Sequence, residues 1–133
     1  MISVFQKIIN GELSAHVVAE DENCMAILDI NPKEKGHVIC FSKKSSEDHF
    51  FNMKDNDYSE IMLFVKKVSN TLYLALKPKR VGMIVAGFDV PHAHIHLIPC
   101  NRVESISLTK SGINISPVEM ENIAKELRNF FEK

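Results

Sequence analysis

Residues 92–98 read His-Ala-His-Ile-His-Leu-Ile, so three histidines alternate with apolar side chains. Successive side chains of a β-strand point to opposite faces, and a strand would place His92, His94 and His96 together on one face. A helix would instead spread the three imidazoles around its circumference. The alternation therefore predicts a strand with a face of histidines and an apolar face that is turned to the core.

Four more short apolar runs, separated by turn residues, precede this segment. They are predicted to be strands at 16–20, 24–30, 37–41 and 81–86. A parallel crossover needs a dozen or more residues, and most of the connections here are shorter. The pairing of the strands is therefore expected to be mainly antiparallel.

Two longer segments have the periodicity of amphipathic helices. The first covers 58–76, between the third and fourth strands, and Pro78 follows its end. The second begins at Ser116-Pro117-Val118-Glu119, which has a capping residue followed by proline at the first helical position. A short helical turn is expected at 4–9, before Gly11. The predicted fold is α+β, a five-stranded, mainly antiparallel sheet with a long central helix and a C-terminal helix, the helices covering one face.

The size and composition are those of one globular domain, predicted to span 1–133, with 45% hydrophobic and 25% charged residues. The 16 basic and 17 acidic residues leave no surplus of positive charge, so no nucleic-acid partner is expected. No stretch reaches the roughly 20 apolar residues of a membrane span, and the N-terminus does not resemble a signal peptide. Three cysteines without a C-x-x-C pair indicate a reducing, cytoplasmic setting.

A row of histidines on one strand face is compatible with a metal site. Histidine is the commonest metal ligand, and a further ligand would come from His37, Asp29 or Asp89. The outer Cα atoms of the row are roughly 13 Å apart, however, so three imidazoles on one strand would struggle to reach one ion. A merely polar sheet face is the third interpretation, but such a face normally mixes Thr, Lys, Glu and Ser.

A further interpretation is that these histidines act in nucleophilic catalysis. A neutral imidazole, with an unperturbed pKa of about 6.5, is a good nucleophile toward phosphorus near neutral pH. His94 lies between two other histidines, which can fix its tautomer and donate hydrogen bonds to phosphate oxygens. The turn at 87–91 can offer backbone N–H groups to an anion.

The segment 92–98 fits the pattern His-φ-His-φ-His-φ-φ, where φ is apolar, and resembles the signature of the histidine triad (HIT) family of nucleotide hydrolases and transferases. Residues 26–32 (Ala-Ile-Leu-Asp-Ile-Asn-Pro) and 36–39 (Gly-His-Val-Ile) resemble a second block of that family. The opening segment 4–12 resembles its N-terminal block. The resemblance covers residues 3–99 in order and is strongest to the Hint-like branch.

The resemblance implies a role for each of four histidines. His94 matches the nucleophile, which attacks the α-phosphate and forms a nucleotidyl-histidine before water releases the nucleotide. His96 matches a histidine that contacts phosphate and assists departure of the leaving group. His92 and His37 match histidines that orient the nucleophile. The implied mechanism requires no metal and no cofactor.

The same resemblance implies a site for a purine nucleotide. Asp29 matches the acidic residue that holds the ribose hydroxyls, although alone it would be interpreted as a turn-forming residue. The apolar positions that line the base pocket are matched by Phe5, Ile8, Ile27 and Ile30. Members of this length are typically homodimers whose sheets join into ten strands, so a homodimer is expected.

The segment before the histidines departs from the family pattern. Ala86 stands about where many members have Asn, and an alanine methyl cannot donate a hydrogen bond to phosphate. Asp89 stands where a small polar residue is usual, and it is also expected to be one of the nucleotide-binding residues. A carboxylate that faces an α-phosphate is repulsive, so either Asp89 points away or the substrate arrives with a cation or a positively charged leaving group.

The resulting hypothesis is a nucleotide hydrolase of the purine nucleoside phosphoramidase type. A dinucleoside polyphosphate hydrolase of the same family is the nearest alternative. Two alternatives come from other classes: a zinc-binding protein, and a non-catalytic module that binds a nucleotide or a partner.

Overall fold

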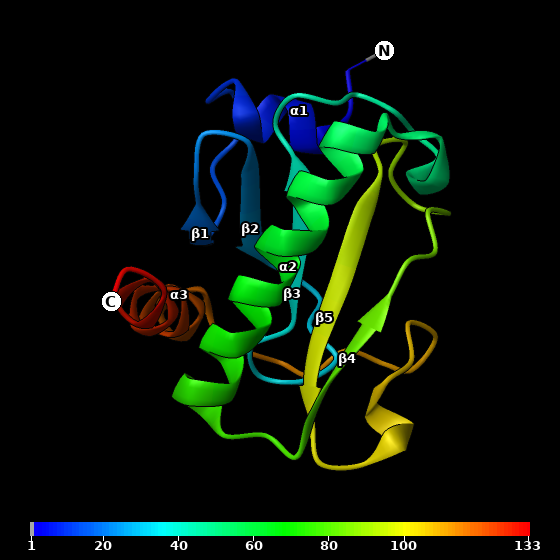
Figure 1. The fold of residues 1–133 in the computed structure, drawn as a ribbon. Coiled ribbons are helices and arrows are strands. Elements are labelled where there is room, and N and C mark those ends of the chain that lie inside the picture. The colour runs from blue at the N-terminus through cyan, green and yellow to red at the C-terminus, as the bar shows by residue number, and fades with distance from the viewer. Residues whose placement is uncertain (1) are drawn as a thin grey trace.

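One sheet of five strands organises the chain in a computed structural model that describes residues 2–133 (Figure 1). The spatial order is β1-β2-β3-β5-β4, and every neighbouring pair is antiparallel. The strands are β1 (Val17–Glu20), β2 (Cys24–Leu28), β3 (Val38–Ser42), β4 (Arg80–Ile84) and β5 (His94–Cys100). The predicted α+β class and five-stranded antiparallel sheet are confirmed.

The helices lie where the hydrophobic periodicity predicts them. They are α1 (Val4–Ile9), α2 (Asp55–Leu76) and α3 (Pro117–Phe131), with short 3₁₀ turns at Phe50–Asn52 and Val103–Ser105. α2 is followed by Lys77, whose left-handed φ of 50° ends the helix ahead of Pro78. α3 follows Ser116, whose Oγ accepts a hydrogen bond from the N–H of Glu119. Among residues 2–133, no helix combines the length and apolar character needed to cross a membrane.

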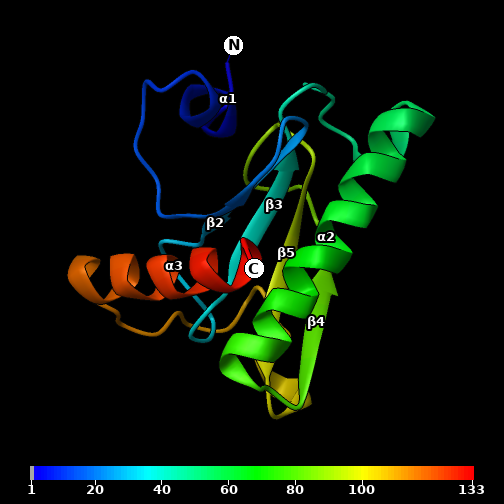
Figure 2. The same cartoon turned by 60° about the vertical axis from the view of Figure 1, so that its left-hand side comes forward.

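The two faces of the sheet are covered unequally. α2 and α3 pack on one face over the main apolar core. α1 lies on the opposite face, as Figure 2 shows, and there Phe5 joins a small cluster of side chains from β2 and β3. The prediction that the helices cover one face is therefore correct for the two long helices only.

The strand of histidines begins later than the sequence predicts. β5 starts at His94 because Pro91 has no N–H and the N–H of His92 turns back to the carbonyl oxygen of Val90, 2.9 Å away. The N–H of Ala93 then donates to the carbonyl oxygen of Glu47 in a loop, over 2.8 Å. His92 therefore lies in the turn before the strand.

The end of β2 also differs from its prediction. The strand stops at Leu28 and not at Ile30, because Oδ1 of Asp29 accepts the N–H of Asn31 and starts a turn. The bounds of the other three strands agree with the predicted ones to within two residues. These two turns bring Asp29 and the histidines to the same part of the sheet.

Candidate active site

β5 presents His94 and His96 to the side of the sheet that carries α1. Directly opposite residues of antiparallel strands share a face, and His94 pairs with Phe41 while His96 pairs with Ile39. Both Phe41 and Ile39 belong to the small cluster around Phe5. The alternate residues of the strand join the main core on the other side. β5 thus has one histidine face and one core face, as the alternation predicts.

Hydrogen bonding determines which nitrogen of His94 is free. Its Nδ1 lies 2.8 Å from the carbonyl oxygen of His92, and because a carbonyl only accepts, Nδ1 carries the proton. In the neutral ring Nε2 therefore has the lone pair, and this atom is buried without a hydrogen-bond partner. Oδ1 of Asp89 lies 3.4 Å from it. A neutral imidazole held in one orientation with a free Nε2 lone pair is suited to nucleophilic attack.

A chain of hydrogen bonds fixes His96 in the opposite tautomer. The backbone N–H of Lys33 donates to Nδ1 of His37 over 3.0 Å, so His37 carries its proton on Nε2. That Nε2–H donates to Nδ1 of His96, also over 3.0 Å. His96 therefore carries its own proton on Nε2, which is buried and unpartnered. The site presents a lone pair of His94 beside an N–H donor of His96, in rings whose centroids are 5.1 Å apart.

Burial keeps the chain of imidazoles neutral. It lowers the pKa of His37 to about 3, and the proximity of His96 adds to this effect. It also lowers the pKa of His96 to about 4, with a further contribution from His94. At neutral pH the N–H that His96 presents therefore belongs to an uncharged ring.

His92 directs both ring nitrogens to protein atoms. Nε2 donates to the carbonyl oxygen of Ser42 over 3.1 Å, which leaves Nδ1 to accept from Oγ of Ser3, also over 3.1 Å. The same Oγ accepts the N–H of Gln6 as the N-cap of α1. Burial lowers the pKa of His92. His92 anchors α1 to the sheet with its side chain and orients His94 with its carbonyl oxygen.

Asp29 has one carboxylate oxygen in a turn and one near the histidines. Oδ1 accepts the N–H of Asn31 over 2.8 Å, so the interpretation of Asp29 as a turn-forming residue is correct. Oδ2 lies 3.5 Å from Nε2 of His37 and 3.9 Å from Nδ1 of His96. Burial raises the pKa of Asp29. The structure thus brings Asp29 to the histidines as well.

A largely apolar cavity of about 410 Å³ adjoins this site. Phe5 and Ile8 of α1 and Ile27 of β2 form part of its wall, and Asp29 and Asp89 also line it. Ile30 lines it too, but this residue is 88% exposed and forms only the rim. The turn after β2 carries Ile30 out of the strand, so this residue is not part of the apolar core.

Several residues of the site gave no signal in the sequence. Leu13, Ser14 and Ala15 line the cavity from a loop, where no periodicity tells which side chains face inward. Ser3 could be predicted as an N-cap, but its bond to His92 spans 89 positions of the chain. Lys33 contributes a backbone N–H, which does not depend on the identity of its side chain.

Within residues 2–133, two groups of side chains could hold a metal ion, because their ligand atoms lie within 4.8 Å of one another. They are Asp29 with His37 and His96, and Asp89 with His94 and His96. In the first group a metal would have to break the hydrogen bond between His37 and His96. In the second it would have to displace the proton from Nε2 of His96, since a ligating nitrogen needs its lone pair. Metal binding at either place therefore requires a rearranged hydrogen-bond chain.

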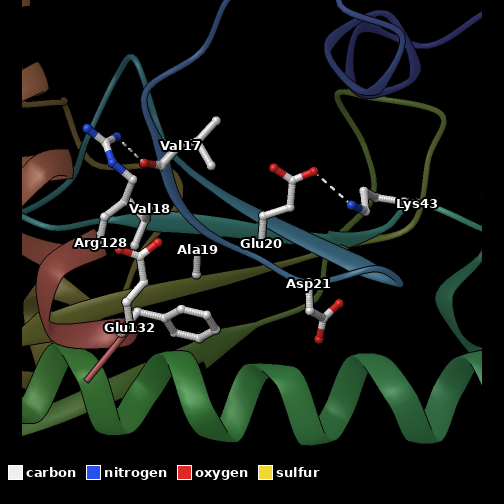
Figure 3. A pocket seen from close by; sticks show the side chains of 9 residues that line it. Val17, Val18, Ala19, Glu20, Asp21, Lys43, Arg128 and Glu132 are labelled. Atoms are coloured by element: carbon white, nitrogen blue, oxygen red, sulfur yellow. Dashed lines mark hydrogen bonds and ion pairs between the residues drawn. The ribbon is translucent and has the colours of Figure 1, made fainter.

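A cavity of about 360 Å³ at the edge of the sheet lies apart from the histidines. It is lined by residues 17–21 and by the end of α3, and none of the predicted site residues belongs to it. Figure 3 shows Lys43 paired with Glu20, at 2.7 Å, and Arg128 directed to the carbonyl oxygen of Val17, at 2.6 Å. Because these two cations already have partners, this cavity is not a candidate site for an anionic substrate.

Comparison with known proteins agrees with this geometry. The HIT domain family model matches residues 10–103. An uncharacterized HIT-like protein of Methanocaldococcus jannaschii is 37% identical over 132 residues, which are 94% of this chain and 98% of the relative. The adenosine 5′-monophosphoramidase of Schizosaccharomyces pombe is 28% identical over 133 residues, 96% of each chain. The crystal structure of a hypothetical histidine triad nucleotide-binding protein of Sulfolobus tokodaii superposes with a TM-score of 0.83, at 29% identity over 96% of this chain and 91% of that one.

Proposed function

Because this chain belongs to the HIT domain family of nucleotide-binding hydrolases, we propose that it is a purine nucleoside phosphoramidase that acts through a nucleotidyl-histidine. The observation that carries the proposal is the pair of buried, unpartnered Nε2 atoms of His94 and His96 in opposite tautomers. One is a nucleophile and the other a hydrogen-bond donor. A phosphoryl group placed between them would meet both requirements of the reaction.

In the first step, Nε2 of His94 forms a bond to the α-phosphorus. The bond between phosphorus and the leaving group breaks, the electron pair departs with the leaving group, and this group takes up a proton from water. The Nδ1–H of His94 remains donated to the carbonyl oxygen of His92, which stabilises the positive charge on the imidazole of the adduct. Nε2–H of His96 donates to an oxygen of the phosphoryl group.

In the second step, water attacks the same phosphorus and the bond to His94 breaks. The electron pair returns to Nε2 of His94, and the attacking water loses a proton to solvent. The apolar cavity beside the site holds the purine, and Oδ2 of Asp29 accepts hydrogen bonds from the ribose hydroxyls. The part of the substrate that does not react is thereby used to position the α-phosphate.

The position of Asp89 supports an amine as the leaving group. Its Oδ1, 3.4 Å from the nucleophilic nitrogen, would repel the phosphate chain of a dinucleoside polyphosphate. The same carboxylate accepts a hydrogen bond from an amine. We expect Asp89→Ser to slow amine-leaving substrates selectively, measured by release of AMP from adenosine 5′-phosphoramidate and from a diadenosine polyphosphate. Equal effects on both substrates contradict this role.

The reaction itself is tested with adenosine 5′-phosphoramidate as substrate. The protein is expected to release AMP with multiple turnovers, without added metal and in the presence of a chelator. Glu126→Gln is the control, because Glu126 is exposed on α3 and does not line the apolar cavity, and this variant should retain the activity. Binding of AMP without turnover would favour the non-catalytic module.

The zinc-binding alternative is supported by the two groups of ligand atoms that lie close enough together for one ion. It predicts one tightly bound zinc per chain in protein purified without a histidine tag. Elemental analysis decides this, and a protein that is metal-free and active excludes it.

The free edge of β4 supports a homodimer. In the part of the chain that the structure describes, β4 pairs only with β5, and Met83 on this strand is half-exposed. Pairing of two copies along β4 would extend the sheet to ten strands. Light scattering should then give twice the mass of 15.1 kDa. The three free cysteines, all buried, are compatible with the proposed cytoplasmic setting.

A further inference from the structure

A second, smaller cavity also reaches the proposed nucleophile. It measures about 190 Å³ and is lined by His94 and Ala93, by residues 48–51 ahead of α2, and by residues 85–87 after β4. The nucleoside cavity described above has about 410 Å³ and lies toward α1. His94 is thus close to two cavities of different size, and the smaller cavity is available to the leaving group.

The wall of the smaller cavity is held by contacts to the turn before β5. The N–H of Ala93 donates to the carbonyl oxygen of Glu47 over 2.8 Å, which fixes the loop beside the histidines. Phe50 is buried, and its ring meets that of Phe51 edge to face at a centroid distance of 5.3 Å. The bond to Glu47 therefore holds the start of this loop at the site, and Phe50 anchors the segment in the main apolar core.

Segment 48–51 supplies one carboxylate, one imidazole and two aromatic rings to the wall, and the lining residues from 85–87 and Ala93 are small or apolar. Asp48 is exposed and lines the cavity, and the lining includes no Lys or Arg. Oε1 of Glu47 lies 3.4 Å from the N–H of His49, so a second carboxylate is close by. Phe51 is 79% exposed although it is a large apolar side chain, and its ring is available to a ligand. An anionic group would be repelled here, whereas a cation with an apolar body is favoured by both residue types.

We infer that this cavity holds the leaving group, and that it selects an organic amine with an apolar body and a second positive charge. The inference rests on the proposed function and specifies the substrate class. Asp48 attracts the distal charge, and Phe51 packs on the apolar chain. When Nε2 of His94 bonds to phosphorus, the phosphorus–nitrogen bond breaks, and the amine departs with the electron pair and takes up a proton from water.

Three N-substituted adenosine 5′-phosphoramidates, each with five carbon atoms in the substituent, test the selection. Their substituents are 5-aminopentyl, which is cationic, pentyl, which is neutral, and 4-carboxybutyl, which is anionic. Each rate constant kcat/KM is divided by that of the unsubstituted phosphoramidate on the same preparation. We expect the cationic substrate to exceed the anionic one by about 5-fold or more, with the neutral one between them.

Asp48→Asn removes the charge at constant shape and should reduce the cation-to-anion ratio by about 2- to 5-fold. Glu126→Gln removes one charge from an exposed position on α3 that does not line the cavity, and should leave the ratio unchanged. Phe51→Ala should lower the relative rate of the pentyl substrate. An equal ratio in wild type and Asp48→Asn overturns the inference. Failure to release AMP from the unsubstituted phosphoramidate overturns the proposed function, which is a different result.

Discussion

The two faces of β5 carry alternate residues of one strand and have different roles. One face packs in the main core, and the other forms part of the candidate active site. Ile95 and Leu97 are buried with α2 and α3 in a core made of apolar side chains. His94 and His96 are equally buried on the other face, but there each ring keeps one nitrogen without a partner. Burial of apolar surface stabilises the first face, whereas an unpartnered buried polar atom is a cost on the second.

The difference indicates that the side chains on the core face of β5 determine stability, whereas those on the histidine face determine activity. On the core face, loss of volume should affect the free energy of unfolding and little else. On the histidine face, loss of a ring nitrogen should affect the reaction and change stability less, because that nitrogen already lacks a partner. Substitutions at neighbouring positions of the same strand can therefore test the separation.

Replacement of the nucleophile has the largest expected effect. His94→Ala removes the Nε2 lone pair, and release of AMP from adenosine 5′-phosphoramidate should fall by at least about 10³-fold. The variant also loses a buried ring and its Nδ1–H bond to His92, so its free energy of unfolding is measured by urea titration and activity is expressed per folded molecule. A variant that keeps a tenth of the activity would show that His94 is not the nucleophile.

Ile95→Ala tests the opposite face one residue away. Truncation of a fully buried isoleucine leaves a cavity in the main core, and the free energy of unfolding should fall by about 2–5 kcal/mol. Turnover per folded molecule should stay close to that of the wild type at a temperature where the variant is folded. If activity falls as steeply as for His94→Ala, stability and activity do not depend on separate faces of β5.

On acidification, the free energy of unfolding is expected to fall because of the buried histidines and not because of the apolar core. The pKa values of His37 and His96 fall from the ordinary 6.5 to about 3 and about 4 in the folded protein. Below pH 6.5 the unfolded chain binds protons that the folded chain does not, so the free energy of unfolding falls as the pH falls toward 4. Between pH 7 and pH 5 the expected loss is about 1–2 kcal/mol for each histidine.

Urea titrations at several pH values measure this loss, and His37→Gln should reduce the slope because one of the two groups is removed. His49→Gln is the control, since His49 is exposed and outside the chain of hydrogen bonds. An unfolding free energy that is constant from pH 7 to pH 5 contradicts the burial of neutral histidines.

Ser3→Ala has the smallest expected effect. It removes the N-cap of α1 and leaves Nδ1 of His92 without its donor, so the free energy of unfolding should fall by about 1 kcal/mol. Ser46→Ala, at an exposed loop position, should change it by less than about 0.5 kcal/mol. Equal effects of the two substitutions would show that the link between Ser3 and His92 contributes nothing.

The fold was predictable wherever the pattern of side chains is local. Alternation of polar and apolar residues located β5, and helical periodicity with Ser116 and Pro78 located the two long helices. The strand ends at Asp29 and His92 were not predictable, because they depend on which partner a backbone N–H finds.

The residues of the site were predictable from the sequence, but the tautomers of its histidines were not. The triple histidine and its resemblance to a family indicated His94 and its neighbours. The tautomers follow from the N–H of Lys33 and the carbonyl oxygen of His92, which are backbone groups and have no signature in side-chain identity. The direction of Asp89 is set by a loop and also had to come from the structure.

The decisive measurement is rapid-quench mass spectrometry of the intact protein after it is mixed with adenosine 5′-phosphoramidate. The wild type should show a transient increase in mass equal to one adenylyl group, and His94→Ala, folded as judged by circular dichroism, should show none. An adduct that persists in His94→Ala, or AMP release by the wild type without any adduct at the shortest times, would contradict attack by Nε2 of His94.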